Sequence, residues 1–165
     1  MGYTHYFGHG KTSAKKWNAI VEDCKKLQAA DDTTIVNNKY VKAGAGWKTV
    51  IEAPKFNTRQ IRFNGIGEDG HEDFILLKSG VEIQPYEKRT STQPISFGFT
   101  FCKTARKPYD TLVCACLLVY KYHSEDTMSL SSDGDEEWEE AEQFVKDTLG
   151  YDLTFKEFDK YKDED

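Results

Sequence analysis

The chain has 165 residues, a formal net charge of −6 and a hydrophobic content of 38%. This size and composition indicate one folded domain over residues 1–165 and exclude a disordered protein. The charge is uneven, because residues 133–165 carry 14 of the 28 acids but only 4 of the 22 basic residues. Phosphate contacts need local positive charge, so the total disfavours duplex nucleic acid, while the basic body suits a small anionic ligand.

No apolar stretch suggests a signal peptide, and none approaches the roughly 20 residues that cross a bilayer. The four cysteines, Cys24, Cys102, Cys114 and Cys116, do not have the spacing of a metal site. We expect buried free thiols, a cytoplasmic location and no membrane contact, metal or cofactor.

The first half of the chain predicts a strand, a helix and several further strands. Alternating apolar side chains predict a short strand at residues 3–7. Apolar positions at helical spacing predict an amphipathic helix at residues 14–30. We expect mostly antiparallel strands after it, at residues 35–41, 47–53, 60–64 and 74–77.

Two glycine-rich stretches resemble nucleotide-binding motifs without satisfying them. In GHGKTS, residues 8–13, the phosphate loop would need a further glycine where this chain has His5. We interpret this stretch as a turn in which Thr12 or Ser13 caps the following helix. GIGEDG, residues 65–70, matches the dinucleotide fingerprint only in letters, because the fingerprint must open a helix and a strand follows here. We therefore expect a hairpin loop.

Residues 97–123 combine a strand, a basic turn and a buried helix. Phenylalanines at alternate positions in residues 97–101 predict a strand with these aromatic rings on its buried face. Pro108 and Asp110 suit the first turn of a helix. This helix is apolar on nearly every side at residues 112–120, so we expect it at the centre of the core.

We expect polar connectors at residues 80–94 and 124–132, followed by a final acidic helix and tail over residues 133–165. Asp133 and Glu136 resemble a capping box at the start of that helix. Together these elements predict an α+β fold, in which a mostly antiparallel sheet packs on two or three helices and one helix is buried centrally.

Four segments resemble those of a group of small proteins encoded by bacteriophages and prophages. They are MGYTHYF at the start, IRFNGIG, FCKTARKPYD, and SSDGDEEW near the end. The resemblance covers most of the chain, and its first and third segments are the most specific. It implies a phage origin and not a chemistry. We therefore expect a protein of host takeover or of evasion of host defence.

The main hypothesis is a binding module for a small anionic ligand, such as a nucleotide or a cyclic-nucleotide immune signal. It requires that the first strand lie beside the segment leading into Pro108. Cations would neutralise phosphate, and aromatic and amide groups would recognise a base. The candidate residues are His5, Asn64, Lys103, Thr104, Arg106, Tyr109 and Asp110.

Two alternatives remain open. One is a hydrolase or phosphodiesterase in which Cys102 is the nucleophile, His5 the base and Asp110 the group that orients His5. The other is an inhibitor whose acidic helix, starting at Asp133, blocks a basic surface of a host protein. The sequence does not decide between them, nor whether the chain forms a homo-oligomer.

Overall fold

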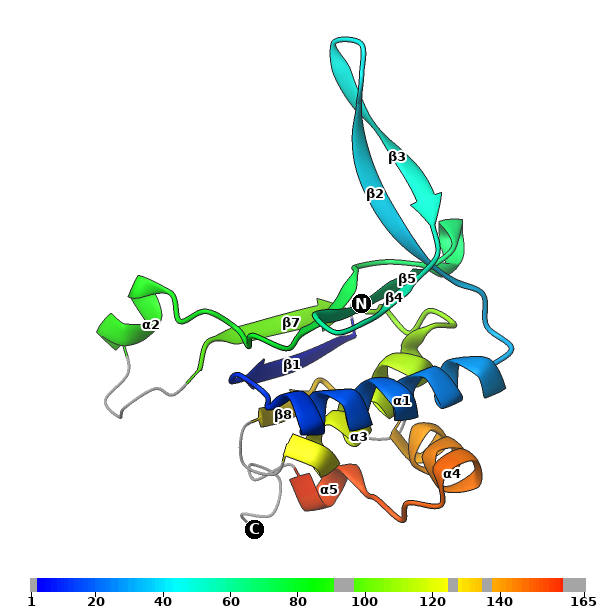
Figure 1. The fold of residues 1–165 in the computed structure, drawn as a ribbon, viewed down its shortest axis with the longest axis vertical. Helices are drawn as coiled ribbons and strands as arrows, with labels where there is room; N and C mark the ends of the chain where they lie inside the picture. The colour runs from blue at the N-terminus through cyan, green and yellow to red at the C-terminus, as the bar shows by residue number, and fades with distance from the viewer. Residues whose placement is uncertain (1–2, 91–96, 125–127, 135–137, 159–165) are drawn as a thin grey trace.

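The structure is a computed structural model that describes residues 3–90, 97–124, 128–134 and 138–158 (Figure 1). It confirms the α+β class. In chain order the elements are β1 (Thr4–His9), α1 (Ala14–Ala30), β2 (Ile35–Ala43), β3 (Gly46–Glu52), β4 (Lys55–Phe56), β5 (Gln60–Gly65), the 3₁₀ helix η1 (Gly67–Asp69), β6 (Phe74–Leu77), α2 (Pro85–Thr90), β7 (Phe99–Lys103), α3 (Asp110–Ser124), β8 (Met128–Ser132), α4 (Trp138–Leu149) and α5 (Phe155–Phe158).

The described strands form two antiparallel sheets. One has the order β7-β1-β8, and the other has the order β3-β2-β5-β4 with β6 paired to β5. The hairpin loop expected at residues 65–70 is confirmed, since η1 lies in the turn between β5 and β6. None of the described helices combines the length and apolarity needed to cross a bilayer.

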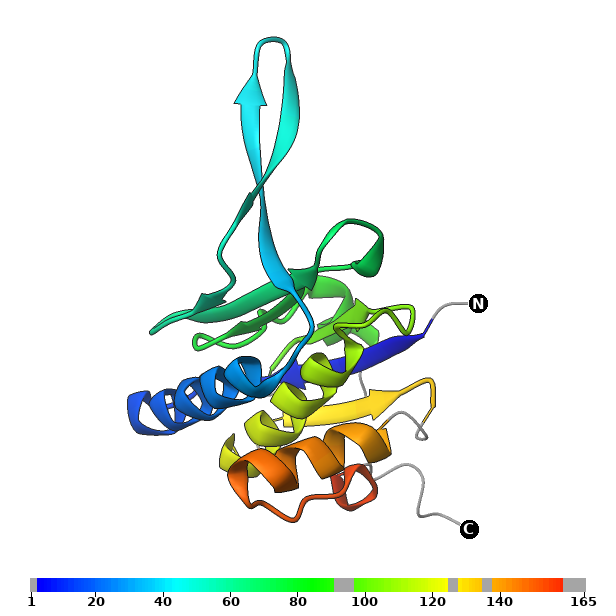
Figure 2. The same cartoon turned by 90° about the vertical axis from the view of Figure 1, so that its right-hand side faces the viewer.

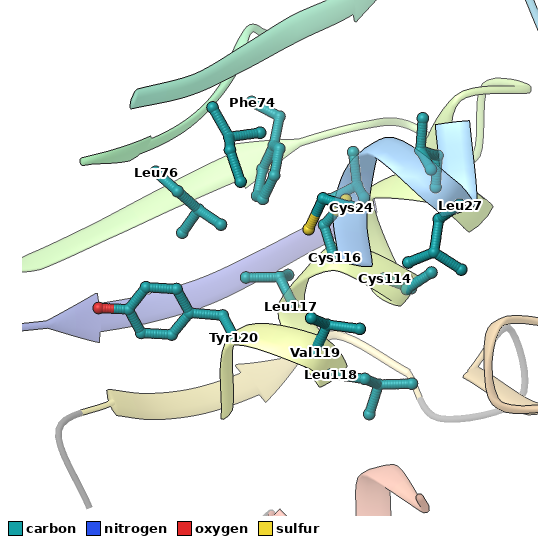
Figure 3. Packing of buried hydrophobic residues seen from close by; sticks show 14 of the residues in the cluster. Cys24, Leu27, Phe74, Leu76, Cys114, Cys116, Leu117, Leu118, Val119 and Tyr120 are labelled. Atoms are coloured by element: carbon teal, nitrogen blue, oxygen red, sulfur yellow. The ribbon is translucent and has the colours of Figure 1, made fainter. Parts of the chain in front are cut away.

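Helix α3 is the centre of the core, as its sequence predicts. Every side chain from residue 112 to residue 120 is buried. A helix that is apolar all round needs neighbours on all sides. Figure 3 shows them: Cys24 and Leu27 approach from α1, and Phe74 and Leu76 approach from β6. The four cysteines are free and buried, which confirms the expectation for the thiols.

Strand β1 lies beside β7, as the ligand hypothesis requires. Thr4 pairs with Lys103 and His5 pairs with Cys102 in an antiparallel register. The backbone N–H of Thr104 then donates to the Tyr3 carbonyl at 3.1 Å, which continues the contact beyond the end of β7.

The prediction that the β7 phenylalanines face the core was wrong. Phe99 and Phe101 are 49% and 54% exposed, whereas Cys102 is fully buried. The core lies on the face of β7 that carries Cys102, so the aromatic rings lie on the opposite, outer face. Tyr6, which pairs with Phe101, stacks there on Phe99 with ring centroids 6.1 Å apart.

Two of the expected polar connectors contain regular structure. Residues 124–132 include β8, which pairs with β1 and turns Met128 and Leu130 inward. Residues 80–94 include the short helix α2. The expected start of the acidic helix also differs: α4 begins at Trp138, and the Asp133 carboxylate accepts a hydrogen bond from the Thr4 backbone N–H. Glu136 lies outside the described residues.

The hairpin of β2 and β3, which we call the arm, projects away from the body (Figures 1 and 2). In the described chain β2 pairs with β5 only at Ile35 and Val36, and from Asn37 onward its partner is β3. Gly44, with φ +61°, takes the positive φ that a tight hairpin turn requires. Both views place the arm at the opposite end of the molecule from α4 and α5.

Candidate functional site

His5 is the centre of a buried polar network that joins four parts of the chain. Its Nδ1 lies 2.6 Å from Ser132 Oγ, and its Nε2 lies 2.6 Å from Asp110 Oδ1. The Thr104 hydroxyl donates to the same Asp110 oxygen at 2.5 Å, and the Trp138 indole N–H donates to Ser132 Oγ at 3.2 Å. The network therefore connects β1, the turn into α3, β8 and α4.

The network is closed to solvent over most of its length. His5, Thr104 and Trp138 are fully buried, and Asp110 is nearly so. Only Ser132, at the end of β8, is partly exposed. The three candidate residues His5, Thr104 and Asp110 do converge, and in this arrangement they satisfy one another's hydrogen bonds.

His5, Asp110 and Cys114 also place potential metal ligands within 4.8 Å of one another. Their spacing is that of hydrogen bonds, because His5 Nε2 and Asp110 Oδ1 are only 2.6 Å apart. Two ligands bound tetrahedrally to zinc at about 2.0 Å lie about 3.3 Å from each other. As arranged, the three side chains form part of the polar network and not a metal cage.

The other candidate residues bond to groups outside the His5 network. Lys103 and Tyr109 both bond to Glu72: the Lys103 N–H donates to its carboxylate at 2.7 Å, and the Tyr109 hydroxyl donates to its carbonyl at 2.6 Å. Arg106 lies over the Tyr3 ring, 4.6 Å from its centroid. The Asn64 side chain closes the turn between β5 and β6 through the backbone of His71 and the carboxylate of Asp73, the residues on either side of Glu72.

The structure argues against Cys102 as a nucleophile. Its sulfur donates to the Glu72 carbonyl at 3.7 Å, and burial raises the pKa of the thiol far above its usual range. A thiolate is the reactive form of cysteine, so burial in the protonated form disfavours this thiol as a nucleophile. The hydroxyl that does contact His5 belongs to Ser132, which sequence reasoning missed because it lay in an expected connector.

A basic cleft lies outside the predicted site. It has a volume of about 550 Å³ and is formed where the loop before α1, the turn before β5 and the end of β6 meet. We define the basic cleft by its lining residues: Lys11, Thr58, Arg59, Gln60, Leu77, Lys78 and Ser79.

Backbone hydrogen bonds fix the three segments of the basic cleft relative to one another. The Thr12 N–H donates to the Lys78 carbonyl at 2.9 Å, and the Lys78 N–H donates to the Arg59 carbonyl at 2.9 Å. Because the backbones of Lys11, Arg59 and Lys78 are held in this way, their cationic side chains start from fixed positions around one cleft.

Gly80 lets the β6 end approach the loop before α1. It has φ +84°, and a Cβ at this position would lie 2.6 Å from the Gly10 carbonyl carbon. The loop is also held by Tyr120 of α3. The Tyr120 hydroxyl lies 2.7 Å from Thr12 Oγ1 and 3.0 Å from His9 Nδ1. The expected N-cap at Ser13 is confirmed, since its side chain accepts from the Lys16 N–H.

The basic cleft concentrates positive charge without compensation. None of its described lining residues is acidic. Within the part of the chain that the structure describes, no carboxylate forms an ion pair with Lys11, Arg59 or Lys78. Three cations around one concave surface raise the local potential and attract an anion.

A further cleft, of about 540 Å³, has the opposite charge. It lies between α1, α3 and α4, and the carboxylates of Asp31, Asp32, Glu140 and Asp147 are among its lining groups. This is the kind of acidic surface that the inhibitor hypothesis requires.

Sequence reasoning did not find the basic cleft because its cations come from three separated segments. The Gly-Lys-Thr turn that contains Lys11 resembles part of a phosphate loop, but the motif alone does not show that Arg59 and Lys78 lie beside it. Comparison of the chain with family models, with curated proteins and with solved structures finds no match.

Proposed function

We propose that the protein binds a small phosphate-bearing ligand, such as a nucleotide or a cyclic nucleotide, in the basic cleft. The observation that carries this proposal is the grouping of Lys11, Arg59 and Lys78 around one cleft with no acid among its described lining residues. Lysine and arginine are the side chains that neutralise phosphate, and arginine adds a planar fork of donors.

The size and lining of the cleft favour a nucleotide over a simple anion. Its volume of about 550 Å³ lies within the usual range of about 300–1,000 Å³ for small-molecule sites. Thr58, Gln60 and Ser79 add neutral donors and acceptors that can recognise a sugar or a base. The N-terminus of α1 begins three residues after Lys11, and its dipole adds positive potential on that side.

The biological role that we propose follows from the resemblance to phage proteins. A phage protein that binds a nucleotide tightly removes it from solution, and sequestration of an immune signal would protect the phage. This role needs binding alone and no chemistry on the ligand.

The test is isothermal titration of the full chain with pyrophosphate, ATP and a cyclic dinucleotide. We expect at least one to bind, and we expect Lys11→Ala, Arg59→Ala and Lys78→Ala each to weaken binding by about tenfold, because a charge-assisted hydrogen bond contributes about 1.5–3 kcal/mol. Lys15→Ala is the matched control, since it removes an exposed lysine of α1 outside the cleft.

Two results would contradict the proposal. One is that none of the three anions binds to a protein shown to be folded. The other is that binding survives the three cleft substitutions and is lost in Lys103→Ala or Arg106→Ala, which would return the site to the residues expected from the sequence.

A second candidate function is acyl transfer by Ser132. The observation in its favour is the Ser132–His5–Asp110 chain, with both links at 2.6 Å, because a hydroxyl, an imidazole and a carboxylate in series can activate a nucleophile. A fluorophosphonate probe should then label the native protein and fail to label Ser132→Ala. Ser129→Ala, on the same strand, should label normally, and no labelling of the wild type would exclude this function.

A further inference from the structure

The arm carries exposed aromatic side chains on one face. Tyr40 is 67% exposed, Trp47 is 72% exposed and Ile51 is 58% exposed. The register pairs Tyr40 with Thr49 and Lys42 with Trp47, so alternation along the strands places the three apolar side chains on the same face of the hairpin. Exposed aromatic surface gathered in this way marks a contact site.

The arm also carries positive charge over most of its length. Residues 37–51 contain Lys39, Lys42 and Lys48 and no acid. The acidic helix α4 lies at the other end of the molecule (Figures 1 and 2). The net charge of −6 therefore does not describe the arm, whose own field favours an anionic partner.

A groove at the root of the arm provides an independent observation. It has a volume of about 270 Å³ and runs beside Tyr40. Its described lining residues are Asn37, Asn38, Lys39, Tyr40, Glu52, Lys55 and Arg62.

Two buried polar atoms of these lining residues have no partner within the described chain: Asn37 Oδ1 and Arg62 Nε. Asn37 is only 4% exposed, and its Nδ2 donates to Glu52 Oε1 at 2.6 Å. That hydrogen bond is the first cause of the lowered pKa of the Glu52 carboxyl. Because an ionised carboxylate only accepts, the amide orientation is fixed and Oδ1 is left as a free acceptor.

An unpaired nucleobase fits this combination of groups. The edge of one base presents both donors and acceptors, which suit Asn37 Oδ1 and Arg62 Nε in the groove. Asn37 lies three positions from Tyr40 and so on the other face of β2, which means that the ring of Tyr40 stacks on a neighbouring base. Leaving buried polar atoms unsatisfied is unfavourable, so a ligand that pairs with them gains affinity.

We propose that the arm and the groove at its root bind single-stranded nucleic acid, with bases on Tyr40 and Trp47 and phosphates on the arm lysines. A duplex does not fit, because its bases are already stacked and paired. Self-association through the arm is disfavoured, because a second copy would bring two sets of three lysines together and their like charges would repel. This site is distinct from the basic cleft and does not depend on the function proposed for it.

The test uses fluorescein-labelled 12-nucleotide strands of oligo-dT and oligo-U, and a duplex of equal length, titrated with the full chain at several salt concentrations. We expect single strands to bind more tightly than the duplex. Tyr40→Ala and Trp47→Ala should each weaken binding by about tenfold, since stacking is worth about 1–3 kcal/mol per base. A preference between the two strands would show whether the 2′-hydroxyl is read.

Further variants separate stacking from charge. Lys39→Ala and Lys42→Ala should each reduce the salt dependence, by a slope of about 1, whereas Asn37→Ala should weaken binding and leave the slope unchanged. Phe101→Ala is the matched control for an exposed aromatic, and Lys15→Ala is the control for an exposed lysine.

Intrinsic fluorescence gives a readout at the arm itself. Trp17 and Trp138 are fully buried, so Trp47 is the tryptophan that acrylamide reaches in the described structure. Bound oligonucleotide should protect it from quenching. Equal affinity for duplex and single strands, or unchanged binding in the Tyr40→Ala, Trp47→Ala double variant, would overturn the proposal. Concentration-dependent protection of Trp47 without oligonucleotide binding would also overturn it and assign the arm to contacts between copies.

Discussion

His5 Nε2 lies 2.6 Å from Asp110 Oδ1, and this contact joins the second residue of β1 to the first residue of α3. The two residues are 105 positions apart in the chain. Because Thr104 and Ser132 extend the same network, the strand that opens the fold, the helix at its centre and β8 are held in one arrangement.

Replacing Asp110 by alanine should destabilise the fold strongly. The substitution leaves the buried hydroxyl of Thr104 and the buried imidazole of His5 without their common acceptor, so we expect a loss of about 3 kcal/mol in the free energy of unfolding. Urea denaturation measures it. Asp152→Ala, at an exposed aspartate, should change stability by less than about 0.5 kcal/mol. Equal stabilities would show that the network does not hold the core.

Stability should fall in acid through His9. Burial lowers the pKa of His9 from 6.5 to about 4. The unfolded chain therefore takes up a proton below pH 6.5, and the folded chain does so only near pH 4. Between these values the unfolded state binds more protons, so the free energy of unfolding decreases by about 3 kcal/mol as the pH falls through this window.

Urea denaturation at pH 7, 6, 5 and 4 checks the His9 prediction. His9→Gln should flatten the dependence between pH 6.5 and 4, because the titrating imidazole is gone. His71→Gln, which removes an exposed histidine, should leave the wild-type dependence in place. The same slope in the wild type and in His9→Gln would contradict the account.

Gly80→Ala should disturb the basic cleft. The residue has φ +84°, and a Cβ would lie 2.6 Å from the Gly10 carbonyl carbon and 2.8 Å from the Lys11 nitrogen. Backbone strain alone costs about 1–2 kcal/mol, and the contact forces the loop away from β6. We expect lower stability and weaker phosphate binding. Gly46→Ala, in the arm, has open space around the added Cβ and should leave phosphate binding unchanged.

The four cysteines should resist alkylation in the native protein. All are buried, and burial raises the thiol pKa of Cys24 and of Cys102. Iodoacetamide at pH 8 should therefore modify none within minutes, while addition of urea should expose all four, as mass spectrometry can count. Rapid modification of a single native thiol would instead identify a reactive cysteine, and Cys102→Ala would show whether it is the one proposed from the sequence.

The local sequence pattern predicted most of the secondary structure correctly. The apolar run in α3, the helical spacing in α1 and the turn at residues 65–70 each depend on neighbours a few positions away, and the structure agrees with all three. The face of β7 was assigned wrongly for the opposite reason. Alternation shows that a strand has two different faces, but only the elements packed on it decide which face is buried.

The site follows the same division. The sequence alone predicts the α+β class, the central helix and the buried thiols, and it shows a mildly basic body with an acidic end. These features follow from composition and periodicity, which are properties of the chain itself. Only the tertiary structure decided that His5 and Asp110 are bonded inside the core, that Lys11, Arg59 and Lys78 share a cleft, and that the arm lies at the other end of the molecule from the acidic helix α4. Each of these depends on which distant segments pair, and pairing is fixed by the packing of the whole molecule.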